Sequence, residues 1–241
     1  MQRFENQVVF REQCPVQLAP KEWMNSIRCT QNEFLHNLEF VKCKFESAGI
    51  TTYGAPINRS TARHVRLKDC VVGSFFGTGA VFDEVVVDGL RASRAPVILF
   101  GCAFRHVVVT GICGRFLINH QVSFDNDQRN ADFDSANTAF YETVDWALDI
   151  SNAKVACLEI RGSIPSRLVR RNPDEHFIMT RPIALAGEWR NYEPPGAVQI
   201  GVSTFLDSGA EDNLFVAARR SKHFKQEVEY FHRLKLAGLV T

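Results

Sequence analysis

The chain has 241 residues, of which 45% are apolar, and a formal net charge of +1. The length allows a substantial core, and the near-neutral charge argues against a nucleic-acid binder and against a strongly acidic decoy of nucleic acid. No segment has the apolar length that crosses a bilayer, and the amino terminus lacks a signal-peptide pattern, so we expect a cytoplasmic protein.

The first 24 residues precede any clear repeat. They carry scattered apolar side chains at Val8, Phe10, Val16 and Trp23. Because the first strands of a stacked sheet would otherwise leave an open edge, we expect residues 1–24 to form an N-terminal cap.

Apolar side chains then recur every five residues. The clearest series is Leu67, Val72, Gly77, Phe82, Val87 and Ala92, resumed by Leu99, Phe104, Val109 and Gly114. Small or apolar companions stand two positions earlier, at Val65, Cys70, Phe75, Ala80, Val85 and Leu90, then at Val97, Cys102, Val107 and Ile112. Shorter traces are Cys29–Phe34, Phe40–Phe45–Ile50 and Ile150–Val155–Ile160. A period of five fits neither a helix nor a flat strand, but it fits a chain that turns a corner every five residues.

The best matches to a five-residue motif are Cys43-Lys44-Phe45, Ala48-Gly49-Ile50, Ala80-Val81-Phe82 and Cys102-Ala103-Phe104. In these segments the chain resembles the pentapeptide-repeat family. The resemblance implies a mainly β fold, a right-handed quadrilateral parallel β-helix solenoid in which both apolar positions point inward and neighbouring coils share one core. We expect the coils to span residues 25–164. A β-sandwich with Val-rich strands and a larger three-faced β-helix, with a period of 20 to 22 residues, remain alternatives.

Cysteine and histidine usage indicates no metal site. The chain has seven Cys and seven His residues, without a CxxC pair or a zinc-like spacing. Cys43, Cys70 and Cys102 occupy the small inward position, so we expect reduced thiols in the core. His64 and His106 precede corresponding strands and should lie on one outer face. We expect no cofactor.

The five-residue period stops between about residues 120 and 146. From residue 120 to residue 150 there are seven acidic residues and one basic residue, Arg129, whereas residues 27–118 carry eleven basic and seven acidic ones. An insertion of this length between coils is a natural place for a functional loop.

Three interpretations of this acidic segment compete with a simple solvated loop. Paired carboxylates suit glycoside hydrolysis, and alternating acids suit calcium, although the Gly and Glu of an EF-hand are missing. Aromatic residues among the acids favour docking of a protein instead, because such residues act as interface anchors inside a charged rim. The expected partner-binding residues are Asp125, Asp127, Asp132, Asp134, Phe140, Tyr141 and Glu142.

After Ile164 the pattern changes. Strands are expected around Phe177–Thr180, Ala197–Leu206 and Leu214–Ala218, followed by an amphipathic helix over Ser221–Leu236 that begins with Ser221 as N-cap and stops at Gly238. We therefore expect residues 165–241 to form a C-terminal α/β or helical cap.

Two functions follow from these expectations. The first is a non-enzymatic bacterial protein-binding module, such as an immunity protein or inhibitor that binds a toxin or another enzyme. The resemblance also suggests gyrase inhibitors that imitate duplex DNA, but the net basic coils disfavour that role. The second is a β-helix carbohydrate-active enzyme that uses the acids from Asp125 to Asp134.

Overall fold

The computed structural model describes residues 1–5, 8–9, 27–29, 34–52 and 54–241. Its strands are β1 (Gln2–Glu5), β2 (Val8–Val9), β3 (Ile27–Cys29), β4 (Phe34–Val41), β5 (Lys44–Thr51), β6 (Thr61–Thr78), β7 (Val81–Asp83), β8 (Val86–Ala92), β9 (Val97–Phe100), β10 (Ala103–Arg105), β11 (Val107–Ile112), β12 (Arg115–Asn119), β13 (Leu148–Asp149), β14 (Ala153–Lys154), β15 (Cys157–Arg161), β16 (Val169–Arg170), β17 (His176–Thr180) and β18 (Asp212–Val216). Its helices are α1 (Asp127–Tyr141), α2 (Arg181–Ala186), α3 (Gly196–Ser208) and α4 (Phe224–Leu236), with short 3-10 turns η2 (Pro56–Asn58), η3 (Ser166–Leu168) and η4 (Glu188–Tyr192).

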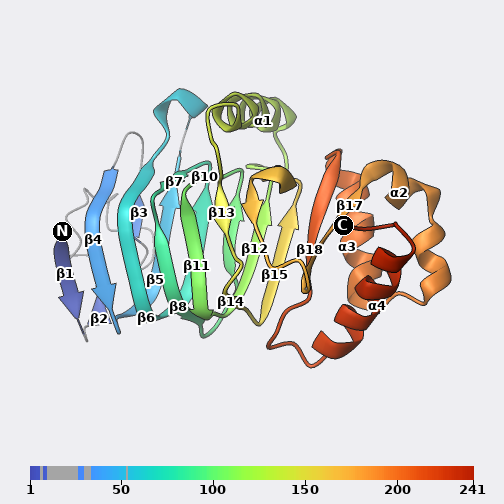
Figure 1. Ribbon diagram of the computed structural model, residues 1–241. Helices are drawn as coiled ribbons and strands as arrows, with labels where there is room; N and C mark the ends of the chain where they lie inside the picture. The colour runs from blue at the N-terminus through green and yellow to red at the C-terminus, as the bar shows by residue number, and fades with distance from the viewer. Residues whose placement is uncertain (6–7, 10–26, 30–33, 53) are drawn as a thin grey trace.

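The protein is mainly β, built on a curled and mostly parallel sheet (Figure 1). Ala62 pairs with Phe82, and Phe82 pairs with Phe104, so the chain returns to an equivalent position after 20 and then 22 residues. Leu67 pairs in the same way with Val87. Four repeats of five residues account for the shorter return, which explains why the five-residue period aligns apolar side chains between neighbouring strands.

Residues expected to form the N-terminal cap partly belong to the sheet. Strand β1 pairs in parallel with β4, and β2 pairs with β5. The sheet therefore begins before residue 25. Phe10, Val16 and Trp23 lie outside the described residues.

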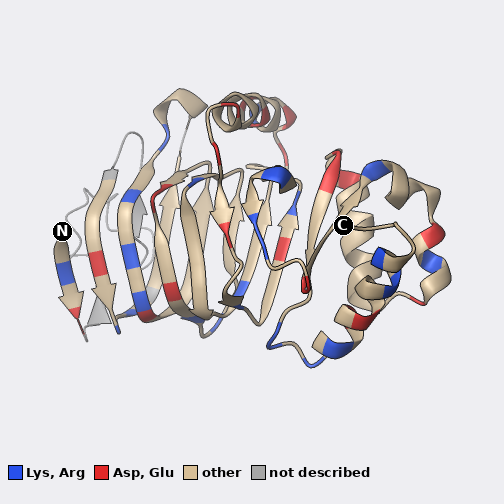
Figure 2. Ribbon diagram, in the orientation of Figure 1, with Lys and Arg blue, Asp and Glu red and all other residues tan. Residues whose placement is uncertain are grey.

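The positions of charged residues along the chain are marked in Figure 2. Basic bands cross β6, where Arg63, Arg66 and Lys68 are exposed, whereas acidic residues gather on α1. The outward position of Arg66 and Lys68 agrees with the five-residue pattern, since both alternate with apolar inward residues.

Left-handed backbone recurs at one turn of the chain. Glu84 (φ 53°) separates β7 from β8, and His106 (φ 53°) separates β10 from β11. His64 (φ 52°) lies at the equivalent position of β6, because Arg63 pairs with Asp83 and Asp83 with Arg105. As expected, the two histidines lie on the outside, His64 2.7 Å from Glu84 and His106 2.6 Å from Asp145.

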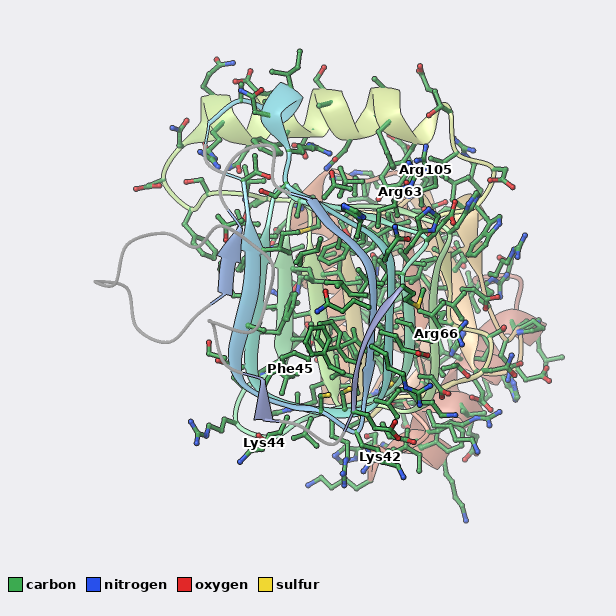
Figure 3. The ribbon with its side chains drawn as sticks, turned by 90° about the vertical axis from the view of Figure 1, so that its left-hand side faces the viewer. Lys42, Lys44, Phe45, Arg63, Arg66 and Arg105 are labelled. Carbon is green, nitrogen blue, oxygen red and sulfur yellow. The ribbon has the colours of Figure 1, made fainter. Side chains whose placement is uncertain are left out.

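Beside this turn, the aligned side chains of Arg63, Asp83 and Arg105 form an ion-pair ladder, and its two arginines are labelled in Figure 3. The carboxylate of Asp83 is 2% exposed and accepts a hydrogen bond from Arg105 Nε at 2.7 Å, and Arg63 Nε lies 3.2 Å from the same carboxylate. Burial alone would raise the pKa of Asp83, but the hydrogen bond and charge of Arg105, with the charges of Arg63 and His106, hold it below its ordinary value.

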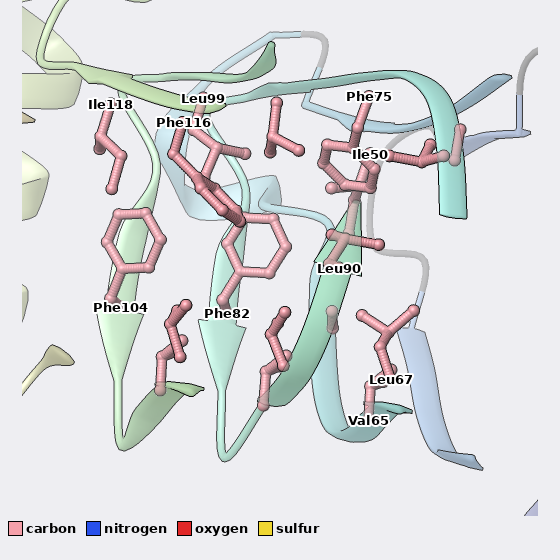
Figure 4. Close-up of a pocket in the computed structure, with 18 of the residues that line it drawn as sticks. Ile50, Val65, Leu67, Phe75, Phe82, Leu90, Leu99, Phe104, Phe116 and Ile118 are labelled. Carbon is pink, nitrogen blue, oxygen red and sulfur yellow. The ribbon is translucent and has the colours of Figure 1, made fainter. Parts of the chain in front are cut away.

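The inward positions of the pattern form one continuous core (Figure 4). Phe45, Leu99 and Phe104 are buried, and Phe82 is partly buried with its ring stacked on that of Phe104 at 5.6 Å. This confirms the inward positions of the pattern. The wholly apolar interior leaves a cavity of about 150 Å³. Ile112 contradicts the pattern, since it is 55% exposed at the end of β11.

The part of the chain after residue 164 has its own core. Strand β17 pairs antiparallel with β18, and β18 joins the main sheet through Glu159 of β15 opposite Phe215. Helices α2, α3 and α4 pack around a second cluster that includes Phe177, Phe205 and Phe231. Residues 165–241 thus contain an α/β unit at this end of the sheet (Figure 1).

Two of the strands expected here, and the final helix, are confirmed by β17, β18 and α4. The expected N-cap is wrong, because α4 begins at Phe224 and its N-cap is His223, not Ser221. The strand expected over Ala197–Leu206 is wrong, because this segment lies in α3. Val198, Val202 and Phe205 are its buried residues, and their spacing of four and three places them on one helical face. Gly238 (φ 73°) follows α4, where the left-handed backbone ends the helix.

Candidate functional site

The acidic segment leaves the sheet as expected, but it forms helix α1 and not a loop. The helix lies across one end of the strands of the main sheet (Figure 1). Asn126 is its N-cap, and the side chain of Asn126 accepts a hydrogen bond from Arg129 N at 2.9 Å. Asp127 in the first turn lies near the positive end of the helix dipole, which further stabilises this start.

One aromatic ring holds the middle of α1 on the sheet. Phe133 is completely buried and lies against Gly79, whose positive φ of 61° and lack of a Cβ leave room for the ring. Any Cβ at position 79 would collide with the Phe133 ring. The guanidinium groups of Arg59 and Arg129 lie 4.9 and 5.4 Å from the centre of the same ring.

The remaining contacts beneath α1 are largely polar. Arg59 Nη1 donates to Asn137 Oδ1 at 2.7 Å, and Arg129 Nη2 donates to the carbonyl of Thr52 at 2.7 Å. Arg59 Nε and Nη2 are buried without a hydrogen-bond partner in the described part of the chain, and burial lowers the pKa of Arg59. The helix is therefore docked by a few directed contacts around Phe133 and not by a broad apolar face.

The seven residues expected to bind a partner differ in their exposure to solvent. Four are exposed: Asp125, Asp127, Asp132 and Glu142. Asp134 is half-buried, and burial raises its pKa. Phe140 is also half-buried and packs against the core of the sheet.

Tyr141 cannot anchor a partner, which corrects the expectation from sequence. Its side chain is 4% exposed, and its hydroxyl accepts a hydrogen bond from Phe104 N at 3.3 Å. Burial raises its pKa. Tyr141 instead fixes the end of α1 to β10.

A groove of about 480 Å³ lies between the start of α1 and the outer face of the sheet. We call it the α1 groove; it is lined by Ala48, Gly49, Thr51, Phe76, Thr78, Val122, Ser123, Asp125, Asn126 and Arg129. Its size falls within the range of about 300–1,000 Å³ that is typical of ligand pockets. Of the seven residues expected from sequence, Asp125 is the one that lines it.

An aromatic ladder borders the α1 groove. The rings of Phe76 and Phe100 are 5.3 Å apart, and those of Phe100 and Phe124 are 5.2 Å apart. Phe100 is buried, but Phe76 is 47% exposed and Phe124 is 81% exposed. Two aromatic rings thus face solvent on either side of a buried third.

The apolar surface continues along the sheet from Phe76. Phe76 pairs with Ile98, and Ile98 pairs with Leu117, so the three outward side chains form a row across β6, β9 and β12. Ile98 and Leu117 are both half-buried. A row of this kind on an outer sheet face is unusual beside the polar residues that normally alternate there.

Hydrogen bonds hold the loop between β12 and α1 in one conformation. Asn130 Oδ1 accepts from the backbone N–H groups of Val122 and Ser123 at 2.9 and 3.0 Å, and its amide donates to the carbonyl of Ser123 at 2.9 Å. The hydroxyl of Ser123 donates to Asp125 Oδ1 at 2.7 Å. The carboxylate of Asp125 is therefore oriented at the α1 groove before any ligand arrives.

Sequence reasoning did not identify Phe76, Phe124 or Arg129 as site residues. A signal existed for Phe76, because it stands between the inward positions 75 and 77 and must point outward. Phe124 immediately precedes the acids, but its exposure depends on the turn before α1. Arg129 was noted only as an isolated base.

The site shows no arrangement typical of a metal centre. Among the described residues, no three His, Cys, Asp or Glu side chains converge where a metal ion could be held. Nor does any helix in the described ranges combine the length and hydropathy required to span a membrane. No family model, curated protein or solved structure matches the chain.

Proposed function

We propose that the protein is a non-enzymatic binding module that docks another protein on the face around the α1 groove. The observation that carries this proposal is the exposure of two aromatic rings at a preformed groove: Phe76 lines the groove, and Phe124 is linked to Phe76 through the buried ring of Phe100. Exposed aromatic side chains of this kind lose unfavourable contact with water when a partner covers them, and they are typical anchors of interfaces. The row through Ile98 and Leu117 extends the docking face along the sheet.

The charges at the edge of this face favour a basic partner. Asp125, Asp127 and Asp132 are exposed on and beside α1. Acidic side chains at the edge of an interface steer a partner of opposite charge during association. A toxin or another enzyme held by an immunity protein or inhibitor in a bacterial cell is the partner class that we propose.

The scaffold that we propose is a right-handed quadrilateral β-helix similar to pentapeptide-repeat proteins. Its support is the return of the chain after 20 to 22 residues, together with the burial of residues spaced by five. We propose a cytoplasmic location, supported by the free and buried thiols of Cys43, Cys70 and Cys102.

The geometry gives less support to a carbohydrate-active enzyme. Glycoside hydrolysis needs two carboxylic groups that face each other across the scissile bond. Asp125 lines the α1 groove, whereas Asp132 is exposed on α1 and accepts a hydrogen bond from Gln128 at 2.8 Å. Within the described part of the chain, no carboxylate other than that of Asp125 lines the groove.

The test is a quantitative pull-down from a lysate of the native host, with the wild-type protein and two variants as bait. Phe124→Ser removes the most exposed ring of the docking face, and Leu236→Ser is the control because Leu236 is 90% exposed on α4, in the C-terminal unit. We expect a protein retained by the wild type and by Leu236→Ser to be lost with Phe124→Ser. Equal retention by both variants, or no specifically retained protein, contradicts the proposal.

Binding kinetics with the recovered partner then test the role of charge. Reversing Asp127 and Asp132 to Lys should slow association and weaken its dependence on salt, because these side chains steer the encounter. Phe124→Ser should instead accelerate dissociation. Unchanged rates in all variants would move the interface to another face, such as the basic bands at Arg66 and Lys68.

A further inference from the structure

The α1 groove combines three features that rarely coincide on a surface. It has an aromatic wall formed by the exposed ring of Phe76, a carboxylate that accepts a hydrogen bond from Ser123, and a volume of about 480 Å³. From these features we infer that the groove is the anchor pocket for an arginine side chain of the partner. This inference rests on the proposed protein-binding function and specifies which side chain the site recognises.

The aromatic wall suits a guanidinium group better than an ammonium group. Phe76 lines the groove and packs against the buried ring of Phe100, and Phe124 packs against the same ring beside the groove. The planar guanidinium stacks on aromatic faces, and its cation–π attraction acts within about 6 Å of a ring centre. The aliphatic part of an arginine side chain would also cover the exposed edge of Phe76.

The carboxylate of Asp125 supplies the matching charge. Ser123 donates to one of its oxygens at 2.7 Å, and Asn130 fixes Ser123 through backbone hydrogen bonds. A carboxylate can accept two parallel N–H bonds from a guanidinium, which is the strongest geometry for such a pair. Because Asp125 is already oriented, little side-chain entropy is lost when the pair forms.

Arg129 also lines the groove and has the same charge as the proposed ligand. Its Nη2 donates to the carbonyl of Thr52 at 2.7 Å, and its guanidinium lies over the ring of Phe133 beneath α1. Arg129 is thus held toward the sheet by contacts within the protein. Its repulsion should keep an incoming guanidinium at the side of the groove where Asp125 and Asn126 lie.

The test uses the full-length ¹⁵N-labelled protein and three peptides that differ in one side chain. The peptide acetyl-Gly-Arg-Phe-Gly-amide is compared with its lysine and citrulline counterparts by titration in NMR spectra. We expect the arginine peptide to shift amide signals of residues 48–51, 76–78 and 122–129. It should bind at least about tenfold more tightly than the other two, because neither of them offers both the charge and the planar fork.

Two variants with the same change in charge test the carboxylate. Asp125→Asn keeps an oxygen that accepts from Ser123, and Glu229→Gln makes the same change of charge at an exposed residue of α4, in the C-terminal unit. We expect about a tenfold loss of affinity for the arginine peptide with Asp125→Asn and no loss with Glu229→Gln.

Equal binding of the arginine and lysine peptides overturns the inference, as does an unchanged affinity of Asp125→Asn, a set of shifts on another face, or the absence of shifts. The outcome is separable from that of the proposed function. If the arginine peptide does not bind at the groove while Phe124→Ser still abolishes retention of the partner protein, the arginine assignment alone is wrong. If both fail, the docking face itself is wrong.

Discussion

The ion-pair ladder of Arg63, Asp83 and Arg105 allows a sharp prediction about stability (Figure 3). The three residues are register partners on β6, β7 and β10. The carboxylate is buried, with 3% of its side chain exposed, whereas the side chains of Arg63 and Arg105 are 50% and 38% exposed. Removal of the arginines and removal of the carboxylate should therefore lower the free energy of unfolding by different amounts.

The double change Arg63→Met and Arg105→Met leaves a buried carboxylate without a partner, which costs about 3–5 kcal/mol in the free energy of unfolding. The change Asp83→Ala should cost less, about 1–3 kcal/mol, because both arginines can turn toward solvent. Arg66→Met is the matched control, since Arg66 is exposed on the same strand as Arg63, and it should change stability by no more than about 0.5 kcal/mol.

The dependence on pH provides a second check of the same ladder. In the wild type the pKa of Asp83 is lowered, so its stabilising contribution is present above the ordinary aspartate pKa of about 3.9 and is lost as pH falls through the folded-state value. Without the arginines, burial should raise the pKa of Asp83. The cost of the double change should then shrink when the pH falls from 7 to 5, as the buried carboxylate takes up a proton.

Urea unfolding followed by circular dichroism at both pH values measures these differences. The reasoning is refuted if Asp83→Ala costs more than the double arginine change at pH 7. It is also refuted if the double change costs no more than Arg66→Met.

Three further predictions concern the core and the docking of α1. Phe104→Ala should lower the free energy of unfolding in urea by about 3–5 kcal/mol, because the ring is 3% exposed; a loss below about 1 kcal/mol would contradict an inward position. Burial raises the pKa of Cys70 to about 11 and that of Cys102 to about 12, so neither thiol should react with a thiol reagent in the native protein at pH 8, and rapid native labelling of both would argue against this core. Gly79→Ala should displace Phe133 and speed hydrogen exchange across α1, whereas unchanged exchange would show that the ring does not depend on the glycine.

The core could be predicted from sequence because one rule applied throughout the sheet. Each five-residue step places an apolar side chain inside, so Phe45, Val72 and Phe104 could be identified without knowledge of the strand pairing. Ile112 failed because the left-handed backbone of Gly111 (φ 70°) breaks the alternation, so that Cys113 is buried and Ile112 is exposed. Periodicity predicts which side chains alternate inward, but not where a turn interrupts the alternation.

Helix α1 could not be predicted in the same way. Its buried residues are Asn130, Phe133, Asn137 and Tyr141, whose spacing is helical but whose chemistry is half polar. A search for apolar periodicity does not detect such a face, because Asn130 binds backbone groups of the loop before α1 and Asn137 binds the side chain of Arg59. For the same reason Tyr141 was interpreted as an exposed anchor when it is buried against β10.

The docking site depended on tertiary contacts that no local pattern contains. Asp125 was identified from the acidic run, yet its neighbour Phe76 is 49 positions away in the chain and reaches the same groove through the sheet. Phe124 is exposed because Asn130 fixes the turn on either side of Ser123. Such contacts between distant segments become visible only in the folded protein.

Hydroxyl-radical footprinting of the protein, free and bound to the partner recovered in the pull-down, tests the proposed docking face most directly. The rings of Phe76 and Phe124 are exposed in the free protein and should be oxidised, as should Leu236 on α4. In the complex we predict that oxidation of Phe76 and Phe124 falls severalfold while that of Leu236 is unchanged. Unchanged oxidation of both rings in the complex would contradict docking at the α1 groove.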